Sequence, residues 1–263
     1  MRVSIPLDLC LLALIVSSGC YTSPESAPEE TVSHLIVLLQ DPSPDMRRTS
    51  ALSLGKIATP RAADSLVEHV QDADALVRQY CAWALGNLGE EMPVAAIPRL
   101  IKLLSDPDPE VARTAGQAIG KSGAAVAVPP LLNLLSTDNP VARLAAVEAL
   151  AWLEAPGAYS GLAATLQDSH ASIRQAALAA LGELGDQRAV PLLEARLRAD
   201  ADVGVRSEAA YRLGKLGDER SLGPLRSAIE EQNEDQRVKR WAKWAIAQLS
   251  GPGAPESTTG RVP

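Results

Sequence analysis

The sequence is poor in the residues that most often build catalytic and metal sites. It contains no Phe, four Trp, four Tyr and three His among its 263 residues. The histidines, His34, His69 and His170, are scattered along the chain and have none of the spacings that hold a metal ion. There is also no Gly-x-Ser-x-Gly motif and no glycine-rich phosphate loop after a predicted strand. The sequence therefore predicts no catalytic residues, no metal site and no bound cofactor.

The chain has no excess of positive charge. Its 25 basic and 32 acidic residues give a formal net charge of -7. Proteins that bind nucleic acid need clustered Lys and Arg to displace the counterions of the phosphate backbone. We therefore expect no nucleic-acid partner. The same balance argues against charge-driven docking on anionic lipid.

Long apolar runs are missing as well. The one near the N-terminus, from Leu9 to Val16, is too short for a bilayer, which needs about 20 residues. Because Arg2 precedes it and small residues follow it, this run predicts a signal peptide over residues 1–19. The polar, proline-bearing residues 20–30 predict a flexible tether, and residues 251–263 predict a disordered tail.

The sequence is rich in repetition. A basic anchor residue, followed by small residues and an Ala-Leu-Gly-like triplet, recurs seven times at intervals of 31 to 34 residues. A fixed period of this length is typical of stacked supersecondary units. The anchors are Arg47, Arg78, Ala112, Arg143, Arg174, Arg206 and Lys239. The residue eight places after each anchor is always Gly or Ala, and the residue before that is always aliphatic.

Each copy also carries helix boundary signals. Four residues before the anchors stand Ser43, Asp74, Asp108, Asn139, His170, Asp202 and Asp235, and six of these seven are types that cap helix N-termini. Eleven residues after the anchor, four copies have a Gly suited to the left-handed residue that ends a helix: Gly89, Gly123, Gly185 and Gly217. The spacing predicts a helix of about 14 residues in each copy, preceded by a second helical segment.

Three stretches of the sequence show the repeat most clearly: LVRQYCAWALGNLG, SIRQAALAALGELG and VGVRSEAAYRLGKLG. Each follows an Asp in the preceding turn, and together they resemble HEAT repeats of the short, phycobilisome-lyase type. The resemblance implies an all-α fold, an α-solenoid of about seven stacked helical hairpins over residues 31–250. The third copy, Val111-Ala112-Arg113, is one place out of register, and the fourth has Thr137 where the turn Asp belongs.

The repeated Arg lies in a predicted first turn, where the helix dipole disfavours a cation. Its recurrence therefore implies an acceptor nearby, and an Asp recurs six residues upstream. In the HEAT family, residues of this kind form a hydrogen-bonded ladder between adjacent repeats. We expect this structural ladder, and no catalytic role, for Asp41, Arg47, Asp72, Arg78, Asp106, Arg143, Asp168, Arg174, Asp200 and Arg206.

The segment Ser17-Ser18-Gly19-Cys20 resembles a bacterial lipoprotein signal, which implies cleavage before Cys20 and lipid on its thiol. By the same resemblance, Tyr21 after the Cys favours the outer membrane, with the protein facing the periplasm. Membrane attachment would then come through the lipid anchor only. Ordinary secretion to the periplasm and an uncleaved N-terminus are the alternatives. Cys81 is interpreted as a small core residue.

Six of the eight aromatic residues lie on the anchor-bearing helices, at offsets of two, five or nine from the anchor. These offsets share one helical face, which in HEAT proteins lines the concave surface. One hypothesis is a partner-binding stripe, whose substitution at Trp83 or Trp244 would weaken binding and spare stability. The alternative is that the rings fill gaps between helices. The stripe comprises Tyr80, Trp83, Trp152, Tyr211, Trp241 and Trp244.

These observations favour a non-catalytic scaffold that binds a protein partner in the bacterial envelope. Two alternatives follow from the family resemblance. The first is an enzyme subunit, either phycobilin lyase-like or deoxyhypusine hydroxylase-like. The signal peptide disfavours the lyase, and the lack of any His-Glu pair disfavours the hydroxylase. The second is a purely structural envelope component, which would associate with itself without capturing a partner.

Overall fold

A computed structural model describes residues 29–250, and over this range it contains fourteen α-helices and no strand. Consecutive helices pair as seven hairpins, and the chain divides into two compact units, residues 29–127 and 128–250 within the described range. The predicted signal peptide, Cys20, the tether up to residue 28 and the tail 251–263 lie outside the described residues. The first helix begins at Glu29, two residues before the predicted start of the solenoid.

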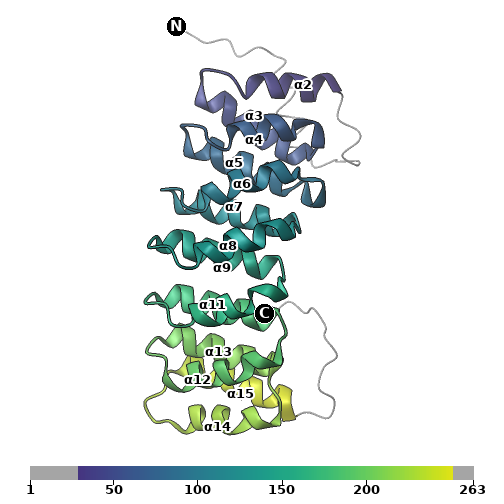
Figure 1. Cartoon of the computed structure of the whole chain (residues 1–263). Helices are drawn as coiled ribbons and strands as arrows, with labels where there is room; N and C mark the ends of the chain where they lie inside the picture. The colour runs from purple at the N-terminus through teal and green to yellow at the C-terminus, as the bar shows by residue number, and fades with distance from the viewer. Residues whose placement is uncertain (1–28, 251–263) are drawn as a thin grey trace. The chain divides into compact units, whose positions relative to one another are not determined.

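The first unit contains three hairpins (Figure 1). Short 3-10 helices lead into the second and third, η2 (Pro60–Ala62) and η4 (Val94–Ala96). The hairpins are α2 (Glu29–Leu38) with α3 (Pro44–Ile57), α4 (Ala63–His69) with α5 (Ala75–Gly86), and α6 (Ile97–Leu103) with α7 (Pro109–Lys121).

The second unit contains four hairpins, which Figure 1 draws from teal to yellow. They are α8 (Val128–Leu134) with α9 (Pro140–Trp152), α10 (Tyr159–Thr165) with α11 (Ala171–Glu183), α12 (Val190–Ala199) with α13 (Val203–Leu216), and α14 (Leu222–Glu230) with α15 (Gln236–Ser250). The anchors lie on the second helix of every hairpin, and we call these seven the second helices. Their lengths, 12 to 15 residues, confirm the predicted length.

The predicted caps are present at five of the seven second helices. The carboxylate of Asp74 accepts from the backbone N–H of Val77, and the residues at the same position of α7, α9, α13 and α15 accept in the same way. Ser43 and His170 make no side-chain capping bond. Local sequence therefore fixes where most of these helices begin.

A left-handed residue stands eleven places after the anchor in five of the seven copies, as predicted for Gly89, Gly123 and Gly185. Ala58 and Glu154 occupy the same position and the same conformation in copies without Gly, at φ values of 52° and 45°. The prediction was wrong for Gly217, whose φ is -66°. Helix α13 ends there in an extended residue, with the Gly217 N–H bonded to the Leu213 carbonyl.

The core of each unit is a layer of Ala and Leu between first and second helices. The aliphatic residue seven places after the anchor is buried in the first six copies and only half-buried at Ile246, on the last described helix. The small residue beside it marks close approach of the next second helix. A Cβ at Gly86 would lie 2.9 Å from the Ala118 Cα, and one at Gly214 would lie 2.8 Å from the Ala245 Cα. Burial of these aliphatic columns replaces the aromatic core that the sequence cannot supply.

Candidate functional site

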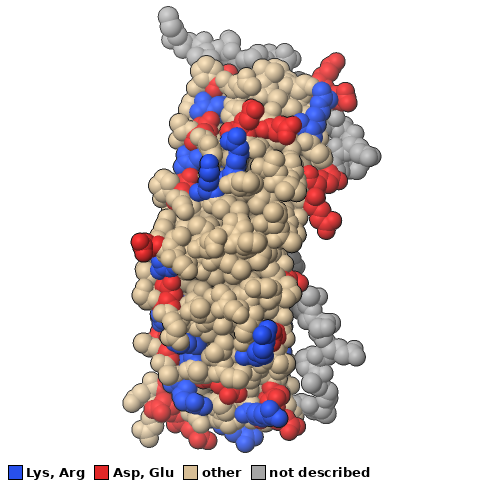
Figure 2. Space-filling model, in the orientation of Figure 1, with Lys and Arg blue, Asp and Glu red and all other residues tan. Residues whose placement is uncertain are grey.

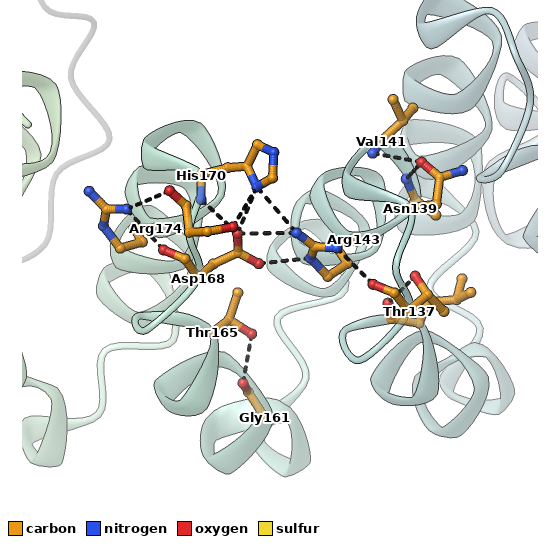
Figure 3. Close-up of polar contacts among 12 residues, drawn as sticks. Thr137, Asn139, Val141, Arg143, Gly161, Thr165, Asp168, His170 and Arg174 are labelled. Carbon is orange, nitrogen blue, oxygen red and sulfur yellow. Dashed lines mark hydrogen bonds and ion pairs between the residues drawn. The ribbon is translucent and has the colours of Figure 1, made fainter.

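An arginine ladder joins the turns of neighbouring hairpins within each unit. In Figure 3, the guanidinium of Arg143 donates to the Asp168 carboxylate of the following hairpin, at 2.7 Å from Nε and 3.2 Å from Nη2. Its remaining Nη1 donates at 2.7 Å to the carbonyl of Thr137 in its own turn. The Asp168 carboxylate also accepts from the backbone N–H of His170 at 2.8 Å. One guanidinium therefore holds two turns together.

The same geometry recurs in both units. Every anchor Arg uses Nε and Nη2 to bind the carboxylate of the next turn and Nη1 to bind a carbonyl of its own turn. The pairs are Arg47–Asp72, Arg78–Asp106, Arg143–Asp168 and Arg174–Asp200. The carboxylates are at most 9% exposed and accept bidentate, charge-assisted bonds. Each Arg binds the carboxylate of the following copy. Asp41, predicted as a ladder residue, differs: its carboxylate accepts from the backbone N–H of Ser43, and Arg47 binds its carbonyl oxygen instead.

One ladder residue was missed. The sequence pattern favours a solvated turn for the acids near Glu234, yet Glu234 accepts from Arg206 at 2.9 and 2.7 Å and is 8% exposed. It stands one place nearer its anchor than the ladder Asp residues do. The extra methylene of Glu compensates for that offset. A search for any carboxylate near the expected position would have found it.

The ladder is interrupted where the sequence repeat is imperfect. In the first unit its last member is Asp106, because the third anchor is Ala112. The neighbouring Arg113 instead pairs with Glu110 on its own helix. In the second unit the ladder begins at Arg143, whose turn carries Thr137 in place of Asp. Each unit thus has its own continuous ladder.

The ladder lowers the pKa of three carboxyls, those of Asp72, Asp168 and Asp200. Burial alone would raise the pKa of Asp72, Asp168 and Asp200, but hydrogen bonds from Arg47, Arg143 and Arg174 and from backbone N–H groups outweigh burial. The net direction for all three is downward. These carboxyls therefore stay ionised over the range in which most proteins are stable.

We expect acid to weaken this ladder. A carboxyl with a lowered folded pKa stabilises the fold above its unfolded pKa, near pH 4, and that stabilisation disappears as the pH falls through the folded value. The urea midpoint, followed by circular dichroism, should therefore drop from about pH 5 to about pH 2. An Asp72→Asn, Asp168→Asn, Asp200→Asn chain should show a smaller drop. Equal drops for both chains would contradict this assignment.

The aromatic residues do not form one continuous stripe. In the second unit Tyr211, Trp241 and Trp244 pack together, with ring centroids 5.0, 5.2 and 5.7 Å apart. Such edge and offset contacts are the favoured geometries of aromatic pairs. Trp152, at the end of α9, is 56% exposed and belongs to no ring cluster among the described residues. The structure therefore brings three of the six predicted residues together.

The rings of Trp83 and Trp244 pack against the preceding hairpin. A Cβ at Gly55 would lie 2.5 Å from the Trp83 ring, and one at Gly214 would lie 2.6 Å from the Trp244 ring. Tyr80 and Trp83 are half-buried on α5. The recurring glycines thus make room for rings of the next second helix. These contacts favour the packing interpretation for Trp83 and Trp244.

A groove lies on the second-helix face of the second unit, beside the three-ring cluster. Its volume is about 430 Å³, and residues of α11, α13 and α15 line it. Pockets that bind ligands commonly have volumes in this range, about 300–1,000 Å³. The lining residues are Gln175, Gly204, Ser207, Glu208, Tyr211, Arg212, Arg237 and Trp241.

The polar side chains of this groove differ in whether they have hydrogen-bond or ion-pair partners. Arg212 bonds to Glu183 and, at 2.7 Å, to Glu208. Burial alone lowers the pKa of Arg212, but these two bonds outweigh it and raise the pKa. By contrast, the Ser207 hydroxyl is buried and has no hydrogen-bond partner in the described range. Arg237 is 63% exposed at the rim and pairs with Asp235 at 3.3 Å.

The described residues contain little else that is chemically distinctive. In residues 29–250 no group of His, Cys, Asp and Glu is arranged to hold a metal ion. No helix in that range has the length and apolarity to cross a membrane. Cys81 is buried, as predicted for a core residue, and burial raises the pKa of its thiol. Basic and acidic side chains are intermixed on the face that Figure 2 shows.

Stacked helical hairpins joined by an arginine ladder define an α-solenoid repeat protein. A family model described as HEAT repeats matches residues 20–86, 66–151, 97–182, 128–214 and 159–247. The chain therefore belongs to the HEAT repeat family and is a HEAT-repeat scaffold.

Solved structures share the helical-repeat fold. A chain in the complex of CpcE and CpcF of phycocyanin lyase from Nostoc sp. PCC7120 is 25% identical, with a TM-score of 0.51, covering 88% of this chain and 99% of that one. YibA of E. coli is 18% identical, with a TM-score of 0.55, covering 93% and 98%. Importin beta is 14% identical, with a TM-score of 0.66, covering 85% and 36%. No curated protein matches the sequence.

Proposed function

We propose that this HEAT-repeat scaffold is not an enzyme and binds a protein partner through the second-helix face of its second unit. The observation that carries the proposal is the groove beside Tyr211, Trp241 and Trp244. Aromatic and Arg side chains supply most of the binding energy at protein interfaces, and here both types line one cavity. The similarity to a chain of a two-protein complex supports a protein partner.

We also propose where the protein is located in the cell. Residues 1–19 act as a signal peptide, and Cys20 carries the lipid that anchors the chain to the bacterial envelope, at the outer membrane facing the periplasm. The support is the sequence around Ser17-Ser18-Gly19-Cys20. One acyl chain binds a membrane only marginally, so stable anchoring requires more than one on Cys20.

Membrane fractionation with crosslinking tests both parts of the proposal. The chain with its native N-terminus should sediment with membranes and retain a crosslinked partner. The Cys20→Ser chain should move to the soluble fraction. A Cys20→Ser chain that stays equally membrane-bound would refute the anchor. Crosslinking only to further copies of this chain would favour the purely structural alternative over partner binding.

A second candidate function rests on the comparison with phycocyanin lyase, since that similarity reaches 25% identity over nearly the whole of both chains. By analogy, this chain would be a lyase-like subunit that handles a chromophore. Its mark would be visible absorbance of the purified protein, or uptake of an added bilin. A colourless protein that binds no bilin would leave the scaffold proposal in place.

A further inference from the structure

Helix α15 carries a charge opposite to that of the whole chain. Between Gln236 and Ser250 it has four basic residues and no acidic one, in a protein of net charge -7. Three of them, Lys239, Arg240 and Lys243, form no ion pair with any described residue. The fourth, Arg237, pairs only with the exposed Asp235. An exposed pair of this kind is weak, so its guanidinium can exchange partners at little cost.

One basic and one aromatic residue of α15 line the groove. Arg237 and Trp241 line it directly and stand one helical turn apart. Arg240 and Trp244 continue the same side of the helix by spacing, and Arg240 is exposed. Tyr211 contacts both tryptophan rings from α13. The result is an aromatic wall edged by two cations, Arg237, whose ion pair is with Asp235, and Arg240, which has no ion pair with a described residue.

The acidic groups around the groove do not cancel this charge. Glu208 is the one carboxylate that lines it, and it accepts a hydrogen bond from Arg212. Glu183 is bound to the same guanidinium. Arg212 is therefore already neutralised, and an incoming carboxylate would meet Arg237 and Arg240.

We propose that this groove binds an acidic segment of the partner protein that also carries an aromatic residue. This inference rests on the proposed function and specifies the chemistry of the partner. Carboxylates of the segment pair with Arg237 and Arg240, which suit bidentate carboxylate recognition. The aromatic residue packs against Tyr211 and Trp241. The backbone of the segment bonds to the Gln175 side chain, which also lines the groove.

Selection from a random library of 12-residue peptides displayed on phage, with the full chain as target, tests this proposal. Selected peptides should contain at least twice the Asp and Glu content of the starting library, together with an aromatic residue. The affinity of the most enriched peptide is then measured by fluorescence anisotropy. We expect Arg237→Glu, Arg240→Glu to weaken binding at least tenfold, and added salt to weaken binding to the original chain.

The matched control is Lys56→Glu, Lys121→Glu, which makes the same charge change at two exposed lysines of the first unit. It should change the affinity less than twofold. Equal weakening by both double variants would overturn the proposal, as would peptides without acidic enrichment or no selected peptide. Binding of phosphatidylglycerol vesicles through Arg237 and Arg240 without acidic peptides would instead assign a membrane ligand. Peptides without acidic bias would leave the proposed protein-binding function intact.

Discussion

Replacing Asp200 with alanine is expected to destabilise the second unit by about 3–5 kcal/mol, the usual cost of removing one partner of a buried ion pair. The Asp200 side chain is 1% exposed and accepts both bonds from Arg174, at 2.8 and 2.7 Å. It also accepts from the backbone N–H of Asp202 at 3.0 Å. Loss of the Asp200 carboxylate leaves the largely buried Arg174 guanidinium and the Asp202 N–H without this acceptor.

Urea unfolding followed by circular dichroism measures this loss. The matched control is Asp186→Ala, which removes a carboxylate that pairs with the exposed Arg188 in the same unit and also accepts from the Arg188 backbone N–H. Exposed pairs contribute about 0–1 kcal/mol and a cap about 1 kcal/mol, so this chain should lose clearly less than the Asp200 variant. Equal free-energy losses in the two variants would show that the ladder is no stronger than a surface ion pair.

Replacing Trp244 with alanine should cost about 2 kcal/mol, below the range for a fully buried ring because Trp244 is only half-buried. The ring stacks on Tyr211 with centroids 5.2 Å apart and covers Gly214. Trp152→Ala removes a ring of equal size that is 56% exposed, and it should change the free energy by less than about 0.5 kcal/mol.

Thermal unfolding of both tryptophan variants separates packing from binding. The stripe hypothesis requires Trp244→Ala to leave the melting temperature nearly unchanged, whereas the observed contacts require a clear drop. An unchanged melting temperature in both variants would support the partner-binding interpretation of Trp244. A drop in the Trp152 variant alone would contradict the observation that Trp152 is more exposed than Trp244.

The fold was predictable because its determinants are local and repeat. Caps such as Asp74 act within their own turn, and the left-handed Gly123 acts at the end of its own helix. Each signal appears in several copies, so an irregular copy such as the one around Ala112 does not obscure the period. The one wrong boundary, Gly217, ends a helix by a different turn that its residue type does not distinguish.

The site was less predictable because it depends on neighbours in the next hairpin. The sequence identified Arg174 as needing an acceptor, but its partner Asp200 lies 26 residues away. Glu234 went unrecognised because a longer side chain shifts its position in the repeat. The six aromatic residues share helical offsets, yet only stacking decides that three of them meet. The groove and the unpartnered Ser207 hydroxyl have no sequence signal at all.

The ladder has a consequence for how such a chain can change in length. Each rung presents the same guanidinium to the same kind of carboxylate, so the rung between two hairpins does not depend on which two they are. Loss of one whole hairpin from the second unit would bring Arg143 to Asp200 in place of Asp168. Duplication would insert one more equivalent rung. Recombination can therefore lengthen or shorten the scaffold by whole hairpins and keep its ladder continuous, while the helix packing beside the new rung has to adjust.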